Sequence, residues 1–465
     1  MKFFKNRIIQ GTILLTIAGF VTRILGFFYR IFLADRLGAQ VLGSYQLIFP
    51  AFIICATIYG AGIQTAISQL TATHIGASGR DTNQTGKRIL IPGIILSLIL
   101  SIGLLLALQW FSVPIATYLL LAPECAPYLK ILSVLFPFCG IGSCINGYYY
   151  GIQDAKVPAV TQIIEQLSRL TFVFAMLIAF PGTPEHNCRI AVWGMVIGEV
   201  VSALYTMGKY YHSTASSSLK IKHKKKEPST ENSYTTYLKP LLLLSITLTG
   251  TKLIIAMLHS AESIFIPASL RQFGCSPEEA LSLYGVLSGM VMPFILFPSS
   301  ITNAIALMLL PAVADSQSSG STDKIKQYFF ISTKYSLLLG FLCTGFFLVT
   351  GNFLGNTFFH NETSGQFLRL LSWLCPFLYL STTLTSIING LGKTKDTFII
   401  TCISQGIKLF CLVILVPRFG IMAYIHGTLA SQIIMALLCF VPLKNYMHKA
   451  SDKSLPAAKN ECSVK

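Results

Sequence analysis

The chain has 465 residues, of which 53% are hydrophobic and only 11% are charged. Soluble globular proteins carry about 25% charged residues, so this composition excludes that class and indicates a membrane protein. The formal net charge is +17, and its distribution along the chain bears on topology and on the kind of ligand.

Apolar windows of about 20 residues, the length that crosses a hydrocarbon core of about 30 Å, recur along the whole chain. We predict an all-α fold with about twelve transmembrane helices. The first is expected to be a retained helix and not a signal peptide, because it is long and Arg23 interrupts it. The predicted ranges are 8–33, 42–68, 89–109, 127–147, 157–179, 190–210, 239–259, 281–312, 328–350, 366–388, 397–416 and 420–441.

Lysine and arginine are distributed unevenly between the connections. With a cytoplasmic N-terminus, the cytoplasmic connections hold 23 of these residues and the opposite ones hold four. Because cytoplasmic loops carry the excess, both termini are predicted to be cytoplasmic. The basic run 223–227 could also suggest nucleic-acid binding. It lies in a Ser- and Lys-rich linker between spans, so we expect contact with anionic lipid and no nucleic-acid partner.

The chain contains an internal repeat. Residues 129–170 align with 368–409 at a constant offset of 239 and without a gap, and Pro137 with Pro376 and Arg169 with Lys408 fall in common register. Such a register predicts two homologous six-helix bundles. Each half has an even number of spans, so both enter the membrane in the same direction, as in many transporters. The predicted domains are 1–210, a basic linker 211–238, 239–443 and a tail 444–465.

The apolar segments contain more cations than anions. A charge at mid-bilayer costs about 2.5 to 3.5 kcal/mol, so such residues normally face protein or water. We expect a central cationic cavity that binds an anionic ligand, because guanidinium groups suit phosphate oxygens. An alternative for Arg30 is that its side chain reaches the membrane interface. The candidate substrate-binding residues are Arg23, Arg30, Arg169, Lys252, Lys334 and Lys408.

Two acidic residues at comparable depth, Glu165 and Glu199, are candidates for binding a coupling ion, H⁺ or Na⁺. Glu165 and Arg169 are four residues apart on a predicted helix and so can pair. A purely structural ion pair therefore stays open. The expected driving energy is the membrane potential or ion exchange.

The sequence shows no signature of an enzyme. Walker A, H-E-x-x-H and G-x-S-x-G motifs are absent, which argues against an ATP-driven pump and a membrane hydrolase. The 12 cysteines are scattered and form no C-x-x-C pair, so we expect neither a metal site nor disulfides. We predict no catalytic residues and no cofactor.

Four stretches of the sequence resemble a known family. They are R-x-L-G-F at 23–27, L-G-x-x-x-L-G-x-Y-Q at 37–46, G-I-Q-x-A-I-S at 62–68, and G-I-Q-D-A-K-V-P with Q-I-I-E-Q-L-S-R between 151 and 169. On these residues the chain resembles the multidrug/oligosaccharidyl-lipid/polysaccharide (MOP) exporter superfamily. Within it, the chain is most similar to the branch of stage V sporulation protein B and polysaccharide biosynthesis proteins, which is related to the lipid II flippases.

The resemblance implies a V-shaped, MATE-like fold in the bacterial plasma membrane. It implies a flippase that moves an undecaprenyl-diphosphate-linked saccharide, a precursor of peptidoglycan or polysaccharide, to the outer leaflet by alternating access. Arg23 matches a family arginine that binds the diphosphate, whereas Arg30 lies one residue beyond the second one. The implied partners are the lipid-linked oligosaccharide, membrane lipids and cell-wall synthesis proteins. Many relatives have two further spans, whereas this chain continues into the polar tail 444–465.

Two other functions remain open. A cation-coupled multidrug exporter has the same fold, but it would favour an acidic or aromatic cavity, which the cationic excess argues against. A non-transporting scaffold for sporulation or cell-wall assembly would recruit partners through the linker 211–238.

Overall fold

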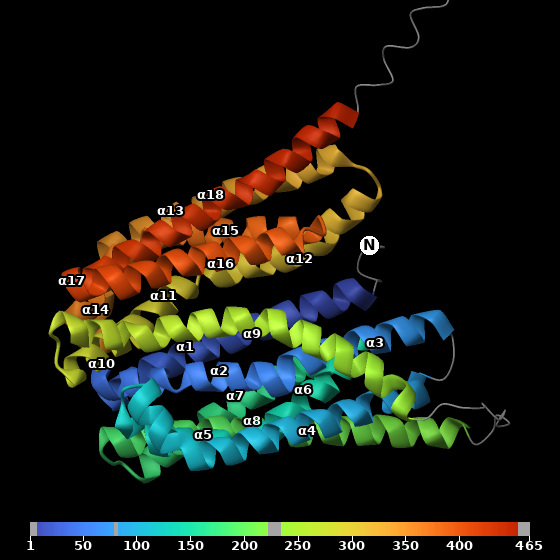
Figure 1. The fold of residues 1–465 in the computed structure, drawn as a ribbon, viewed down its shortest axis with the longest axis horizontal. Coiled ribbons are helices and arrows are strands. Elements are labelled where there is room, and N and C mark those ends of the chain that lie inside the picture. The colour runs from blue at the N-terminus through green and yellow to red at the C-terminus, as the bar shows by residue number, and fades with distance from the viewer. Residues whose placement is uncertain (1–6, 79–81, 222–233, 454–465) are drawn as a thin grey trace, which may run out of the picture. The chain divides into compact units, whose positions relative to one another are not determined.

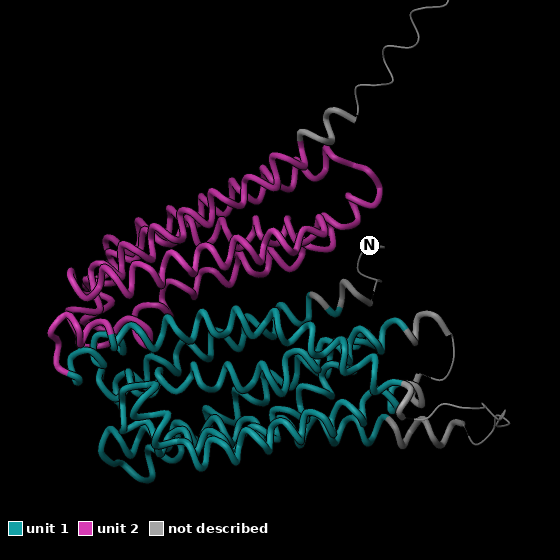
Figure 2. Tube along the Cα trace, in the orientation of Figure 1, with its two compact units in different colours: residues 1–268, 277–285 teal, residues 269–276, 286–465 magenta. Residues whose placement is uncertain are grey.

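The computed structural model describes residues 7–78, 82–221 and 234–453, and these ranges contain helices and no strand. The all-α prediction is therefore confirmed. The basic run 223–227 and residues 454–465 of the tail lie outside the described residues. The chain forms two compact units (Figure 2): unit 1 holds residues 1–268 and 277–285, and unit 2 holds 269–276 and 286–465.

Unit 1 contains the first nine α-helices and a short tenth. Among its connecting turns, η2 and η3 are π-helical and η4 is a 3₁₀-helix. The elements are α1 (Arg7–Leu47), α2 (Phe49–Ala56), η2 (Thr57–Ala61), α3 (Gly62–Ser78), α4 (Thr82–Pro114), η3 (Ile115–Leu119), η4 (Pro123–Cys125), α5 (Ala126–Ser133), α6 (Phe136–Gly151), α7 (Lys156–Ala179), α8 (Pro184–Ile221), α9 (Tyr234–Phe273, whose last five residues belong to unit 2) and α10 (Pro277–Gly285).

Unit 2 contains the remaining helices, and its turns η5 and η6 are π-helical. Its elements are η5 (Val286–Val291), α11 (Met292–Leu296), α12 (Ser299–Ser318), α13 (Thr322–Phe359), α14 (Glu362–Leu371), α15 (Leu374–Gly390), α16 (Thr394–Phe410), η6 (Cys411–Leu415), α17 (Val416–Phe419) and α18 (Ile421–Lys453).

The packing units and the predicted domains are defined differently. Helix α9 lies mostly in unit 1, so this unit extends past the linker at 211–238. The predicted domains describe a sequence repeat, and the division into bundles 1–210 and 239–443 stays a prediction. Each unit has its own apolar core. One is built around Ile63, Leu90 and Tyr148, and the other around Leu384 and Ile387.

Ten described helices are long and apolar enough to cross a membrane, or up to 12 if two bent pairs each count as one span. The predicted spans 8–33 and 42–68 fall in one helical stretch, Ile13–Thr73, of 61 residues. A straight helix of that length would be about 90 Å long, three times the hydrocarbon core. The chain instead turns back before α2 (Figure 1). Helix α1 is interrupted at Gly38, whose φ of 69° lies in the left-handed region that glycine tolerates, and this position lies between the two predicted spans.

One predicted span differs from the structure. Residues 281–312 were expected to form a single helix, but α11 ends at Leu296 and α12 begins at Ser299. Pro298 lies between them, and a proline both lacks an amide N–H and disfavours helix in the residue before it. Within unit 2, α11 and α12 follow one another in the same direction (Figure 1), so the break interrupts a span and does not reverse it.

Two bent spans lie at equivalent positions of the predicted sequence repeat. The pieces Pro123–Ser133 and Phe136–Gly151 meet at 49°, and Glu362–Leu371 and Leu374–Gly390 meet at 52°. Pro137 and Pro376, which are equivalent in the repeat, each lie in the first turn after the bend. At both bends the hydroxyl of the equivalent serine donates to the carbonyl three residues before it, Ser133 at 2.8 Å and Ser372 at 2.6 Å.

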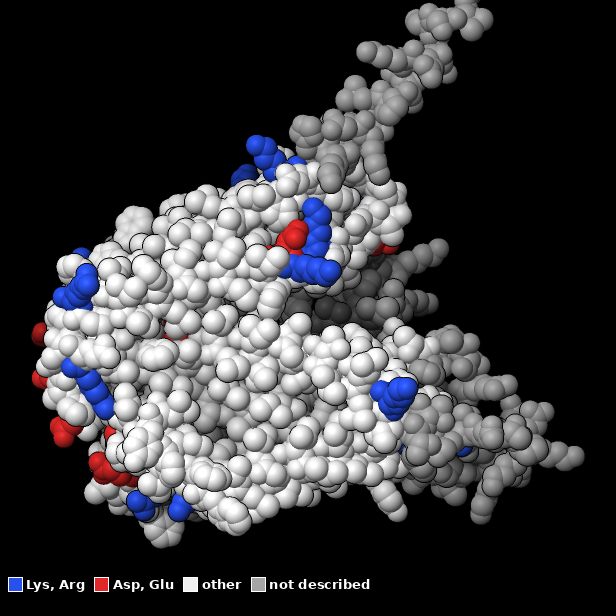
Figure 3. Space-filling model, in the orientation of Figure 1, with Lys and Arg blue, Asp and Glu red and all other residues white. Residues whose placement is uncertain are grey.

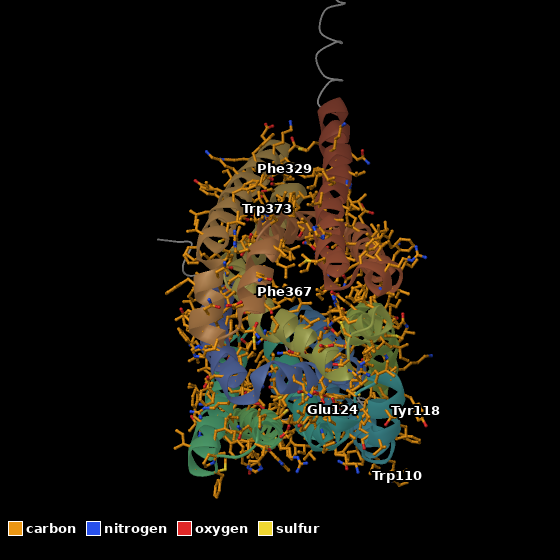
Figure 4. All side chains as sticks on the ribbon, turned by 90° about the vertical axis from the view of Figure 1, so that its left-hand side faces the viewer. Trp110, Tyr118, Glu124, Phe329, Phe367 and Trp373 are labelled. Carbon is orange, nitrogen blue, oxygen red and sulfur yellow. The ribbon has the colours of Figure 1, made fainter. Side chains whose placement is uncertain are left out.

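The distribution of side chains fits a membrane protein. On the visible face, Lys, Arg, Asp and Glu lie towards the ends of the helices, and the broad middle zone of each unit is uncharged (Figure 3). Trp110 and Tyr118 are 80% and 83% exposed, and both project from the outside of unit 1 (Figure 4). Exposed Trp and Tyr are typical of the membrane interface, so the end of α4 and η3 are expected at that depth.

Candidate functional site

The candidate site is built on the contact between α7 and α8, which pack along each other in unit 1. Two glycines of α8, Gly194 and Gly198, face α7. A Cβ atom at Gly198 would lie 2.9 Å from the carbonyl oxygen of Glu165 and 3.6 Å from Nε of Arg169. Small residues four apart let helix backbones approach closely in membranes. Here they make room for the Arg169 side chain to lie against α8.

Arg169 and Glu165 form the ion pair that their spacing predicts. Nη2 of Arg169 donates to Oε1 of Glu165 at 2.5 Å, and the two side chains are 19% and 27% exposed. Nε of Arg169 is buried and makes no hydrogen bond within the described residues. One guanidinium nitrogen, Nη2, therefore binds a carboxylate, and a second nitrogen, Nε, faces α8 without a hydrogen-bond acceptor.

A second carboxylate belongs to the same cluster. Glu199 follows Gly198 on α8, is half-buried, and interacts with both Glu165 and Arg169. The thiol of Cys139 on α6 lies beside Glu199. The structure therefore places the two acidic residues that the sequence singled out near the same arginine.

Helix α1 adds a second cation and two aromatic hydroxyls. Arg30 is exposed and interacts with Arg169 and Tyr45, and Tyr29 and Tyr45 both interact with Arg169. We call Arg30, Arg169, Glu165 and Glu199 the charged cluster. Its formal charges cancel, and it contains two like-charged arginines within interaction range of each other.

Arg23 lies on the same helix, seven residues before Arg30. Seven residues are about two turns, so both arginines occupy one side of α1, and both are exposed. No ion pair of Arg23 is recorded among the described residues. The structure does not place Arg23 in the charged cluster, and its role stays a prediction.

Lys252 on α9 has a different environment. Its Nζ donates to the carbonyl oxygen of Ala61 at 2.7 Å and to Oγ1 of Thr65 at 2.7 Å. Ala61 ends the π-helical turn η2, and another carbonyl of that turn, Tyr59, accepts a hydrogen bond from Ser97 of α4 at 2.6 Å. A π-turn disturbs the regular helical bonding, and Lys252 supplies one of the donors that compensate.

The other two cations are in unit 2. Lys334 is exposed on α13, and Lys408 is half-buried on α16. Lys408 has an interaction partner. The prediction that all six cations contact one ligand is therefore not tested by the structure.

Sequence reasoning missed several parts of this site. Tyr29, Tyr45 and Cys139 approach the charged cluster only through the packing of α1 and α6 against α7 and α8. A tyrosine or a cysteine in an apolar segment does not by itself indicate a binding site. The spacing G-M-V-I-G at 194–198 was visible and could have indicated a close contact between helices. Within the residues that the structure describes, no group of three or more His, Cys, Asp or Glu side chains is suited to a metal ion.

Comparison with known proteins places this geometry in context. The family model described as polysaccharide biosynthesis protein matches residues 8–317, and the MatE model matches 268–414. Stage V sporulation protein B of Bacillus subtilis (strain 168) is 25% identical over 438 residues, which cover 93% of this chain and 83% of that protein. The lipid II flippase MurJ of the same organism is 22% identical over 462 residues, 95% of this chain and 83% of that protein.

Solved structures share the fold. An inward-facing multidrug resistance MATE family transporter of the MOP superfamily superposes with a TM-score of 0.70 at 14% identity, over 94% of this chain and 96% of that one. A MOP superfamily transporter from Pyrococcus furiosus, described as having a binding pocket of reverse polarity, gives 0.66 at 15% identity, over 96% and 97%. These structures confirm the predicted all-α, MATE-like fold, and the family model over residues 8–317 confirms the predicted family.

Proposed function

The chain belongs to the polysaccharide biosynthesis protein family, a branch of the MOP superfamily of membrane transporters, and on this premise we propose that it flips an undecaprenyl-diphosphate-linked saccharide. The headgroup would cross the membrane by alternating access while the prenyl chain stays in lipid. No covalent chemistry is required, and relatives named as a flippase and as transporters support a non-enzymatic role. The similarity to the lipid II flippase supports the choice of a lipid-linked substrate.

One observation carries the proposal: the Arg169 guanidinium is partly exposed, pairs with Glu165 at 2.5 Å and has an Nε without a hydrogen bond within the described residues, and α1, which carries Arg30, packs against its helix α7. Like charges repel, and the repulsion is stronger in a membrane protein than in water because the effective dielectric constant is lower. An anion between the two side chains would turn the repulsion into two attractions. A diphosphate suits this position because each guanidinium can donate two parallel hydrogen bonds to phosphate oxygens.

The same arrangement does not suit a cationic drug, because Arg169 already neutralises Glu165. We assign Arg30 and Arg169 as the diphosphate-binding residues of unit 1. Arg23, Lys252, Lys334 and Lys408 remain candidates for further contacts with the headgroup. Glu165 and Glu199 remain the candidates for binding the coupling ion, and membrane lipids and cell-wall synthesis proteins remain the proposed partners.

Native mass spectrometry of the purified chain tests the assignment. Undecaprenyl diphosphate and undecaprenyl monophosphate compete for the protein, and we expect the diphosphate to be retained preferentially. Arg169→Ala should weaken diphosphate binding about tenfold to hundredfold, the loss of one bidentate charge-assisted contact.

Arg36→Ala is the matched control. Arg36 is an exposed arginine on α1 that pairs with Asp35 at 3.8 Å, outside the charged cluster. We expect this variant to bind like the wild type. Equal binding of both lipids by wild type and Arg169→Ala would refute the assignment of the cluster as the diphosphate site.

A further inference from the structure

The charged cluster has a property that binding alone does not require. A guanidinium binds phosphate most strongly through two adjacent N–H groups. In Arg169, Nη2 is held by Glu165 at 2.5 Å, and Nε is buried against α8, where a Cβ at Gly198 would lie 3.6 Å from it. A bidentate bond to phosphate through Nε therefore requires the side chain to move away from α8 and from Glu165.

Such a movement leaves two carboxylates without their cation. Glu165 and Glu199 interact with each other and share Arg169. When the guanidinium turns to a diphosphate, the two negative charges face each other, and the ligand adds more negative charge nearby. Two carboxylates in one poorly solvated site cannot both stay ionised at low cost, so one of them binds a proton.

Resting on the proposed function, we propose that Arg169 exchanges partners: a bound diphosphate takes the guanidinium from Glu165, and the Glu165 and Glu199 pair takes up one proton from solvent. The exchange makes diphosphate binding and proton binding cooperative. By linkage, each ligand raises the affinity for the other by the same factor.

No other group in the cluster can replace the carboxylates as the proton acceptor. The titratable and charged side chains near Glu165, Glu199 and Arg169 come from α1, η2 and α6. They are Tyr29, Arg30, Tyr45, Tyr59 and Cys139. Arginine stays protonated, and tyrosine and cysteine are ordinarily already protonated at neutral pH. Near pH 7, a proton can be added only to Glu165 or Glu199.

The ion pair is not closed off by the packing of α7 on α8. The side chains of Arg169 and Glu165 are 19% and 27% exposed. The bond to be broken lies within one helix, between residues four apart, and its loss leaves the packing of α7 on α8 intact. The exchange is thus a change of side-chain partners on a fixed backbone.

Isothermal titration calorimetry of the purified full chain with farnesyl diphosphate tests the proposal. Measured near pH 9 in buffers of different ionisation enthalpy, binding should take up as much as one proton, and the affinity should fall with rising pH by at most about tenfold per unit. The double variant Glu165→Gln, Glu199→Gln should still bind but take up no proton. If this variant does not fold, Glu199→Gln alone should reduce the uptake.

Glu185→Gln is the matched control, because Glu185 is an exposed glutamate at the start of the same helix α8. It should keep the proton uptake of the wild type. Wild-type binding of farnesyl diphosphate without proton uptake would overturn the partner exchange and leave the proposed function standing. Failure of the folded wild type to bind farnesyl diphosphate would overturn both.

Discussion

Lys252 was predicted to bind the ligand, but its ammonium group is hydrogen-bonded within the protein. Two of its three N–H donors are bonded to Ala61 and Thr65, which ties α9 to the π-turn η2. We expect Lys252→Met, which keeps the aliphatic stem, to lower the free energy of unfolding by about 1–3 kcal/mol, because the carbonyl and hydroxyl lose a charged donor. Thermal unfolding of the purified protein in detergent measures the change.

Lys334→Met provides the comparison for this residue. The Lys334 side chain is exposed on α13, and a surface substitution of this kind typically changes stability by less than about 0.5 kcal/mol. If the two variants lose the same stability, Lys252 does not stabilise the contact between α9 and η2. Lys252 would then contribute more to ligand binding than to stability.

At the residue scale, the sequence predicted one contact of the site correctly. The pairing of Glu165 with Arg169 follows from a spacing of four on a helix, which is a local property. The partners of Lys252 lie 187 and 191 residues away along the chain, and no local pattern carries that information. The approach of Tyr29 and Tyr45 to Arg169 likewise depends on how whole helices pack.

At the element scale, the close contact of α7 and α8 depends on Gly198. A Cβ there would lie 2.9 Å from a backbone carbonyl, which cannot move without shifting α7. We expect Gly198→Ala to destabilise the protein by about 1–3 kcal/mol and also to weaken diphosphate binding, because Arg169 is displaced. Thermal unfolding and the lipid competition measure the two effects.

Gly208→Ala gives the opposite expectation on the same helix. A Cβ at Gly208 would meet no atom within 4 Å, so the substitution should raise helix stability by up to about 1 kcal/mol. Destabilisation by both alanines to the same extent would mean that the α7 contact does not require a glycine at 198.

The elements themselves were predicted unequally well. The bends near Pro137 and Pro376 fall in the common register that the repeat predicts, because proline acts locally on helix geometry. The break at Gly38 lies between the predicted spans 8–33 and 42–68, where hydropathy placed a connection. The break beside Pro298, inside the predicted span 281–312, was not predicted from hydropathy. An apolar window records how much apolar sequence is present and carries little information on where the backbone turns.

At the scale of the whole molecule, hydropathy, the repeat and four short motifs led to a MOP superfamily transporter, and the family match and solved structures agree. The fold class could be predicted from the sequence because it depends on the number and spacing of apolar segments. Substrate identity depends on a few side chains in a site, and charge alone leaves the headgroup and the coupling ion undetermined.

We propose that the chain moves a diphosphate-linked lipid through contacts with Arg30 and Arg169. The most direct measurement is reconstitution into liposomes with a fluorescent undecaprenyl-diphosphate saccharide, followed by quenching of the label in the outer leaflet. We expect translocation by the wild type and by Arg36→Ala, and at least a tenfold slower rate for the double variant Arg30→Ala, Arg169→Ala. Equal rates for wild type and double variant, or transport of a cationic dye in place of the lipid, would contradict the account.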